Sequence, residues 1–307
     1  MNGLASGALP RMIIGGHHDA RRRDVLRGLS AAALGLLATG CTTPPASPPK
    51  DLPISKTPLI GKFVWRDLHT DNPATVKSFY AALFGWEFTE TRVADRPYTL
   101  VKSGGQPIAG IVQSDRLAPN EPNAQWLSYL SVANVDQSVD RVRAAGGTVL
   151  APPFDLKNIG RAAVVADPQG APIGLLRASF GDPADLPQPT VNRFLWTELL
   201  ARDPIAAASF YAGLVGYEVL VHDQGDKPFR VLKLGRERAG VMRMPFGGMA
   251  PTWLVSVMVA DPAASAQRAQ QLGGRVLVAP RADVRGGSVA LVTDPSGALI
   301  ALQKWTA

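Results

Sequence analysis

Cysteine, histidine and long apolar runs are all scarce in this sequence. Its 307 residues include one cysteine, Cys41, and four histidines. A single thiol excludes an internal disulfide framework and any zinc site built from several thiolates. No uninterrupted apolar run reaches about 18 residues, which excludes a protein with several membrane-spanning helices. The composition, 46% hydrophobic and 19% charged, is typical of a globular protein with a sizeable core.

Positive charge exceeds negative charge, but much of the excess lies near the N-terminus. The formal net charge is +7, and the first 40 residues carry five arginines against two aspartates. Removal of that segment would leave a net charge of +4. Such a small excess argues only weakly for a polyanion as partner. We therefore predict no nucleic-acid partner.

Residues 1–41 have the pattern of an export signal. A basic segment containing Arg22 and Arg23 is followed by an apolar, small-residue stretch over 29–41. That stretch spans roughly 18 Å as a helix, too short for a hydrocarbon core of about 30 Å. The paired arginines resemble a twin-arginine signal. Residues up to Cys41 resemble a lipoprotein cleavage box, in which the cysteine receives lipid; a chance cysteine near an ordinary cleavage site is the alternative.

A proline-rich segment over 42–57 separates this signal from the rest of the chain. Such a segment behaves as a semi-extended spacer, although a frayed N-terminus has a similar composition. The signal and the spacer together predict a periplasm-facing protein of the cell envelope, attached to the membrane through a lipid anchor. Met12 is a second candidate start, which gives a leader of more typical length.

The rest of the chain contains two tandem copies of one domain. Residues 63–88 align without gaps on 194–219, at an offset of 131. Further along, Trp126 recurs as Trp253 and the D-P-x-G-A motif at 167–171 recurs at 294–298, both at an offset of 127. Two long, collinear registers do not arise by chance. The sequence therefore predicts a first domain over 58–181, a linker over 182–190 and a second domain over 191–307.

Each copy is expected to fold as a strand, a helix and three strands, twice over, which is an α+β class. Alternation over 63–70 indicates a strand. A helix begins at Pro73, is capped by Asp71 or Asn72 and ends at Gly85. Further strands are expected at 87–91, 98–103, 108–113, 126–133, 148–151, 161–166 and 172–177, and further helices at 136–145, 204–215 and 262–272.

This order of elements resembles the vicinal oxygen chelate superfamily, which includes glyoxalase I, bleomycin-resistance proteins and extradiol dioxygenases. The resemblance rests on the motifs W-x-[DE]-L, P-x(4)-S-F-Y-x-x-L-x-G-[WY]-E and D-P-x-G-A in both copies, and it covers 58–306. It implies tandem glyoxalase-like domains, each of two βαβββ modules whose curved sheets enclose a cleft. Small molecules are the partners that such a cleft implies.

The metal ligands of the family enzymes have no counterpart in this sequence. The resemblance implies His, Glu or Gln at ligand positions that bind a divalent metal acting as a Lewis acid. Neighbouring candidate positions, 109–112 and 239–242, also lack His and Glu. We therefore predict no family-type metal and no other cofactor. The six positions that should carry ligands are Trp65, Leu127, Gly174, Trp196, Leu254 and Ala301.

Strand alternation predicts which side chains line the two clefts. If Trp65 faces inward, then Phe63, Asp67 and His69 do so as well, while Val64 faces the helix. Aromatic walls around one carboxylate are typical of a small-molecule pocket. Burial would raise the pKa of such a carboxylate, so Asp67 and Glu198 are the candidate catalytic bases. The remaining cleft residues predicted by this rule are Tyr129, Ser131, Phe194, Trp196, Leu200, Ser256 and Met258.

Structural alternatives exist for each of these residues. The tryptophans are also typical of module interfaces, and the buried carboxylates need a partner, such as Arg161, Arg243 or a backbone amide. Asp167 and Asp294 begin D-P-x-G turns, for which we predict a structural role.

Three functions remain open from the sequence. The first is a metal-independent binder of a small apolar or aromatic molecule. The second is a metal-dependent lyase, isomerase or dioxygenase, and the third is a non-catalytic envelope scaffold. The sequence leaves open whether any reaction is catalysed, and it does not name the ligand.

Overall fold

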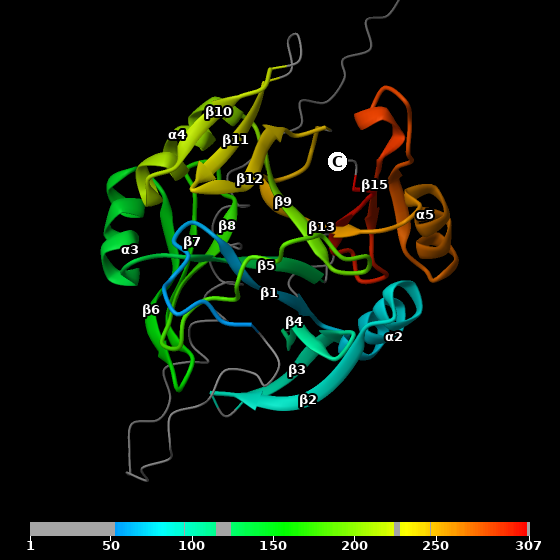
Figure 1. Ribbon diagram of the computed structural model, residues 1–307, viewed down its shortest axis with the longest axis horizontal. Coiled ribbons are helices and arrows are strands. Elements are labelled where there is room, and N and C mark those ends of the chain that lie inside the picture. Colours follow the sequence, from blue (N-terminus) through cyan, green and yellow to red (C-terminus); the bar gives the residue numbers. More distant parts are fainter. Residues whose placement is uncertain (1–52, 95, 115–123, 224–227, 246, 306–307) are drawn as a thin grey trace, which may run out of the picture.

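Two eight-stranded mixed sheets form the body of the protein. The computed structural model describes residues 53–94, 96–114, 124–223, 228–245 and 247–305. The first sheet has the strand order β2-β3-β4-β1-β5-β8-β7-β6, and the second repeats it as β10-β11-β12-β9-β13-β16-β15-β14. Strands β5 and β13 lie next to each other at the centre of the molecule (Figure 1). Within the described ranges, no helix is long and apolar enough to cross a membrane.

The first sheet and its two helices show the predicted βαβββ order twice. The elements are β1 (Phe63–Thr70), α2 (Pro73–Phe84), β2 (Glu87–Val93), β3 (Arg96–Ser103), β4 (Gln106–Gln113), β5 (Ala124–Ser131), α3 (Val135–Ala144), β6 (Thr148–Leu156), β7 (Gly160–Ala166) and β8 (Pro172–Ala178).

The second sheet repeats this order with shorter outer strands. The elements are β9 (Phe194–Ala201), α4 (Pro204–Val215), β10 (Glu218–Val221), β11 (Phe229–Leu234), β12 (Arg236–Arg243), β13 (Thr252–Met258), α5 (Pro262–Gln271), β14 (Arg275–Val278), the 3₁₀ turn η1 (Arg285–Gly287), β15 (Val289–Thr293) and β16 (Leu299–Gln303).

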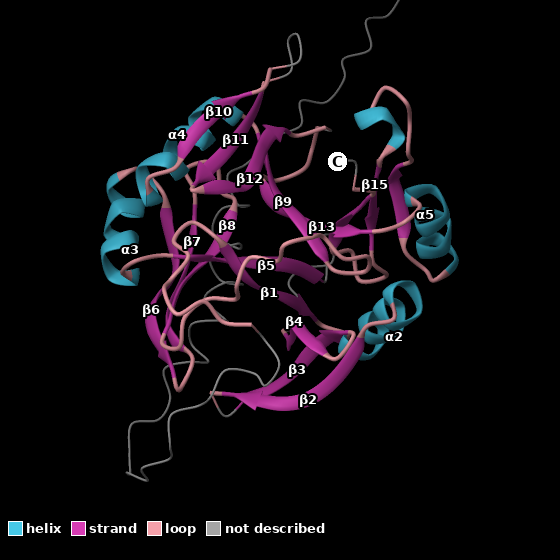
Figure 2. Cartoon of the chain, in the orientation of Figure 1, coloured by secondary structure: helices cyan, strands magenta, loops and turns pink. Residues whose placement is uncertain are grey.

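The helix boundaries follow from local capping. The Asn72 side chain accepts a hydrogen bond from the backbone N–H of Thr75 over 3.1 Å, and Gly85 ends α2 in the left-handed conformation. Asp203 and Gly216 have the same roles around α4. Figure 2 shows α3 and α4 side by side on one flank and α2 and α5 on the opposite flank. The predicted helices are confirmed to within one residue at each end.

Each sheet is built around an antiparallel pair of central strands, β1 with β5 and β9 with β13. The register of the first pair shifts between Phe63 and Trp65. The predicted orientation of Phe63 and Val64 is therefore wrong, because a bulge breaks the alternation at this point. Phe63 packs against Trp253, with ring centroids 4.7 Å apart, while Val64 packs with Tyr129.

The same correction applies in the second sheet. The register of β13 against β9 shifts between Ser256 and Val257, opposite Phe194. Phe194 was expected to face the cleft, but its ring lies 5.4 Å from both Trp86 and Trp126 in the core between the sheets.

The two domains share two hydrophobic cores, each combining one module from each sheet. Tyr80 of α2 donates a hydrogen bond to Asp294 over 3.1 Å, and Tyr211 of α4 donates one to Asp167 over 3.4 Å. The other carboxylate oxygen of each aspartate accepts backbone N–H groups of its own turn, as with Ala171 over 2.9 Å. The D-P-x-G turns thus have the predicted structural role, and they also join the domains.

The segment between the sheets is anchored to both domains. Asp182 accepts hydrogen bonds from the Leu59 N–H and the Ser131 hydroxyl, each over 2.6 Å. Asp185 forms ion pairs with Lys62 of the first domain at 3.0 Å and with Arg238 of the second at 2.8 Å. These polar contacts help to fix the position of one domain relative to the other.

Candidate functional site

The first candidate site surrounds Asp67 at the middle of β1. Asp67 is buried, and its carboxylate accepts hydrogen bonds from the Trp65 indole N–H over 3.1 Å and from the Tyr98 hydroxyl over 2.7 Å. Tyr129, on the neighbouring strand β5, contributes a third hydrogen bond. The structure therefore gathers three neutral donors around one buried carboxylate. We call this group, with His69, the first cleft, after the cleft that the resemblance implies.

Two glycines make room for the tyrosines of the first cleft. A Cβ atom on Gly110 would lie 1.8 Å from the Tyr98 hydroxyl oxygen and 2.6 Å from an Asp67 oxygen. A Cβ atom on Gly174 would lie 2.3 Å from the ring of Tyr129. Any larger residue at either position would displace an aromatic ring, so these glycines are required by close approach.

Burial dominates the electrostatics of the first cleft. It raises the pKa of Asp67, and the charge of His69 and the hydrogen bonds from Tyr98, Trp65 and Tyr129 oppose the shift. Burial and the Asp67 charge also raise the pKa of Tyr98 and Tyr129 well above the ordinary value. Both tyrosines are therefore protonated donors at neutral pH, and Asp67 holds a proton more readily than a carboxyl group in water.

His69 follows Asp67 by two residues and lies on the same face of β1. Burial lowers its pKa, while the nearby charge of Asp67 opposes this effect. Neither ring nitrogen of His69 reaches solvent or has a hydrogen-bond partner within the described part of the chain. A buried imidazole without a partner is a costly arrangement, which a polar ligand would relieve.

The second candidate site has a different chemistry. Glu198 of β9 is buried, and the guanidinium group of Arg285 donates a hydrogen bond to its carboxylate. The Arg285 guanidinium also lies 5.8 Å from the ring centroid of Phe229. We call this ion pair and the apolar side chains beside it the second cleft. Those side chains are Leu200, Met242, Met244, Met249, Leu254, Val278, Val289, Leu291, Leu299 and Ala301.

The two clefts occupy equivalent places in the repeat. At the offsets of the alignment, Tyr98 corresponds to Phe229, while Tyr129 corresponds to Ser256 and His69 to Leu200. Each change removes a donor or a ring from the second cleft. Its carboxylate has an arginine instead, which comes from the turn between β14 and β15.

The structure brings Trp65, Asp67 and Tyr129 together in the first cleft, and the ligand-binding and catalytic roles of all the predicted site residues stay predictions. Trp196 and Glu198 lie on the same face of β9, and Ser256 lies opposite Trp196, whose carbonyl accepts its hydroxyl over 3.2 Å. The two arginines named as partners for the carboxylates are wrong, although Glu198 does pair with an arginine, Arg285. Arg161 pairs with Asp136 and Asp155, and Arg243 donates to a backbone carbonyl.

Two important residues were missed from the sequence. Tyr98 was recognisable, because strand parity on β3 and the alignment with Phe229 place both at the same site. Arg285 had no such signal, because it lies in an irregular turn where alternation does not apply. Cys41, the export signal and most of the spacer fall outside the described residues, so their predicted roles stay predictions.

The side chains of both clefts do not fit a divalent metal of the family type. Of the three ligand positions that the resemblance implied in the first domain, the register brings Trp65 and Gly174 to either side of Tyr129, and it places Leu127 opposite Asp67. The atoms closest to Asp67 are N–H and O–H donors, which oppose a cation of this kind, and Glu198 already pairs with Arg285. In the described ranges, no group of three or more His, Cys, Asp or Glu side chains could hold a metal ion.

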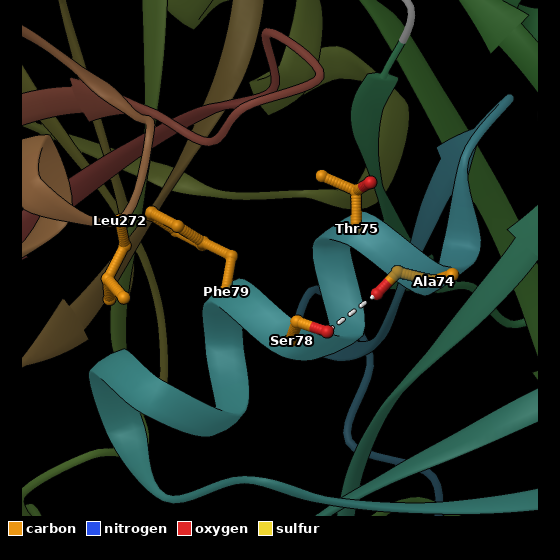
Figure 3. A pocket seen from close by; sticks show the side chains of 5 residues that line it. All are labelled: Ala74, Thr75, Ser78, Phe79 and Leu272. Atoms are coloured by element: carbon orange, nitrogen blue, oxygen red, sulfur yellow. Dashed lines mark hydrogen bonds between the residues drawn. The ribbon is translucent and has the colours of Figure 1, made fainter.

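Two surface pockets lie where helices of the two domains meet, away from both clefts. One of about 350 Å³ lies between α2 and the end of α5, where Phe79 points toward Leu272 (Figure 3). The Ser78 hydroxyl in its wall donates to the Ala74 carbonyl over 3.1 Å. The other, of about 80 Å³, lies between α3 and α4. Neither pocket is lined by a carboxylate or a histidine, so the clefts are the better functional candidates.

Comparisons with known proteins agree with this architecture. The family described as a glyoxalase-like domain matches residues 64–176 and 196–302. A Mycobacterium tuberculosis protein named "Putative glyoxylase CFP32" is 34% identical over 247 residues, covering 78% of this chain and 93% of its own. "Anthracycline biosynthesis protein DnrV" of Streptomyces peucetius is 32% identical over 262 residues, covering 78% and 91%.

Solved structures show the same fold at low identity. The Mn(II)-bound glyoxalase of Novosphingobium aromaticivorans matches with a TM-score of 0.54 and 16% identity, over 80% of this chain and 82% of that one. Together with the two sheets, these matches confirm the predicted α+β class with tandem glyoxalase-like domains.

Proposed function

Because the chain belongs to the glyoxalase-like family, we propose that it binds a small apolar or aromatic molecule in its clefts, without a family-type metal. The fold hosts many activities, so the family alone does not identify the ligand. The proposal rests on the side chains that line the clefts.

The second cleft carries this proposal. Leucine and methionine side chains surround one ion pair, Glu198 with Arg285, on the face of the second sheet. A mostly apolar wall with a few placed polar groups is the usual composition of a small-molecule site. Methionine side chains adapt to ligands of irregular shape. Met242, Met244 and Met249 are only half-buried, which leaves them available for contact.

The name of one relative supports an aromatic ligand. The Streptomyces peucetius protein is named for anthracycline biosynthesis. A fused aromatic ring system would bury its faces against the leucine and methionine side chains and direct a polar substituent toward Arg285.

Fluorescence of the neutral naphthalene dye Prodan tests the proposal. We expect saturable binding with a blue shift in emission, and at least about fivefold weaker binding by Met242→Gln, which loses apolar contact. Val221→Gln is the matched control, because Val221 lies on β10 with 63% of its surface exposed. No saturable binding, or equal effects of both variants, would contradict the proposal.

We also propose that the protein is exported and anchored through Cys41. The basic and apolar segments over 1–41 and the proline-rich spacer over 42–57 support this proposal. An envelope location would give the clefts access to molecules that enter from outside the cell.

A further inference from the structure

The two buried carboxylates differ in how their charge is compensated. Glu198 has an arginine partner. In the described part of the chain, the groups that act on the Asp67 carboxylate are Trp65, Tyr98, Tyr129 and His69. None of these is a lysine or an arginine. A buried carboxylate without a lysine or arginine partner attracts a monovalent cation that reaches it, whereas a divalent metal ion needs further oxygen or nitrogen ligands that these donors do not supply.

The surroundings of Asp67 are suited to an organic cation. Trp65 and Tyr129 are both half-buried and stand on adjacent strands, opposite each other in the register. Aromatic faces attract ammonium groups, and they do so most strongly when the site is partly desolvated. A hydrated metal ion gains nothing from such walls, whereas an alkylammonium ion gains both apolar and electrostatic contact.

His69 provides a second, independent indication. Both of its ring nitrogens are buried and lack a hydrogen-bond partner among the described residues. A neutral imidazole has one acceptor nitrogen, and an ammonium group supplies several N–H donors. One ammonium group placed between Asp67 and His69 could donate to both of them.

We propose that the first cleft is a site for an organic ammonium ion, bound through Asp67 and His69 against the rings of Trp65 and Tyr129. This inference rests on the proposed small-molecule function and names a ligand class for one of its two clefts. The second cleft lacks the features that the inference uses, because Arg285 neutralises Glu198 and a leucine replaces the histidine. The two domains would then recognise different parts of a ligand, or different ligands.

A matched pair of small ligands tests this inference. 2-Phenylethylammonium and 2-phenylethanol share the aromatic body and a polar donor, and they differ in charge. By isothermal titration calorimetry at pH 7, we expect the ammonium compound to bind at least about tenfold more tightly. Asp67→Asn should reduce this ratio to about one, because it removes the charge and keeps the size of the side chain. Asp140→Asn, an exposed carboxylate on α3, is the control and should leave the ratio unchanged.

The outcomes separate the inference from the proposed function. Equal affinity of the two compounds for the wild-type protein overturns the ammonium site and leaves the proposed function in place. A preference that survives in Asp67→Asn also overturns the site. Absence of binding by either compound contradicts both. Should Asp67→Asn fail to fold, as judged by circular dichroism, the wild-type comparison decides alone.

Discussion

The Tyr98 hydroxyl donates a hydrogen bond to the Asp67 carboxylate over 2.7 Å, at the place where the second repeat has Phe229 beside Glu198. This missing hydroxyl is one of several differences between the surroundings of the two buried carboxylates. The first domain stabilises its buried carboxylate with neutral donors, and the second uses Arg285. A duplicated scaffold has in this way acquired two clefts of different polarity.

Because the Tyr98 hydroxyl lies so close to Gly110, we expect that even a small side chain at position 110 destabilises the protein. Gly110→Ala would place a methyl group 1.8 Å from the Tyr98 oxygen, which forces the ring away and breaks its bond to Asp67. We expect a loss of about 1–3 kcal/mol in the free energy of unfolding. Gly213→Ala on α4 is the control, because its Cβ meets no atom within 4 Å and should be neutral or slightly stabilising. Equal urea midpoints for the two variants would show that the packing is not as described.

Because Glu198 and Arg285 form an ion pair, substitutions of the two residues should have non-additive effects on the free energy of unfolding. Arg285→Ala leaves a buried carboxylate without its partner, and we expect it to cost about 1–3 kcal/mol of unfolding free energy. Adding Glu198→Gln should recover at least part of this loss, since the uncompensated charge is then gone. Urea denaturation of both single variants and the double variant measures the coupling. Strict additivity would mean that the two side chains do not interact.

Asp294 predicts a pH dependence of stability. Burial raises its pKa to about 6, against about 3.9 in the unfolded chain. Because the folded value is the higher one, this contribution to stability is complete below about pH 4. It is lost as the pH rises through about 6, and its full size is of the order of 3 kcal/mol.

Asp294→Asn isolates this contribution, because asparagine does not titrate. Between pH 4 and pH 7.5 the unfolding free energy should fall less in the variant than in the wild type, by about 2 kcal/mol. The comparison between the two proteins removes the opposite effect of Asp136, Asp185 and Asp223, whose pKa values are lowered by their basic partners. Parallel pH profiles would contradict the buried position of Asp294.

Cys41 predicts covalent attachment of lipid. In a bacterial host that processes lipoproteins, metabolic labelling with a palmitate analogue should mark the wild-type protein. Cell fractionation should then find the labelled protein in the membrane fraction. Cys41→Ser should abolish the label and release the protein from the membrane, because the proposed attachment is the lipid on Cys41. Labelling of Cys41→Ser, or an unlabelled wild type, would refute the anchor.

Much of the fold was predictable from the sequence, because the duplication supplied two independent copies of each signal. The capped helix after β1 and the turn at Asp167 depend on local chemistry, which short motifs record. The orientation of Phe63 was not predictable, since the bulge in β1 reverses the alternation of side chains and no residue in the sequence indicates it. Arg285 was not predictable either, because its contact with Glu198 joins residues 87 positions apart through an irregular turn.

The most direct test of the proposed function is ligand binding before and after removal of metal ions. Purified mature protein is dialysed against a chelator, its metal content is measured, and Prodan binding is then repeated with and without Mn, Fe, Ni or Zn salts. We expect less than about 0.1 metal ion per chain and an unchanged dissociation constant for Prodan throughout, because the cleft side chains do not form a divalent-metal site. A stoichiometric metal that survives purification, or binding that appears only when metal is returned, would contradict it.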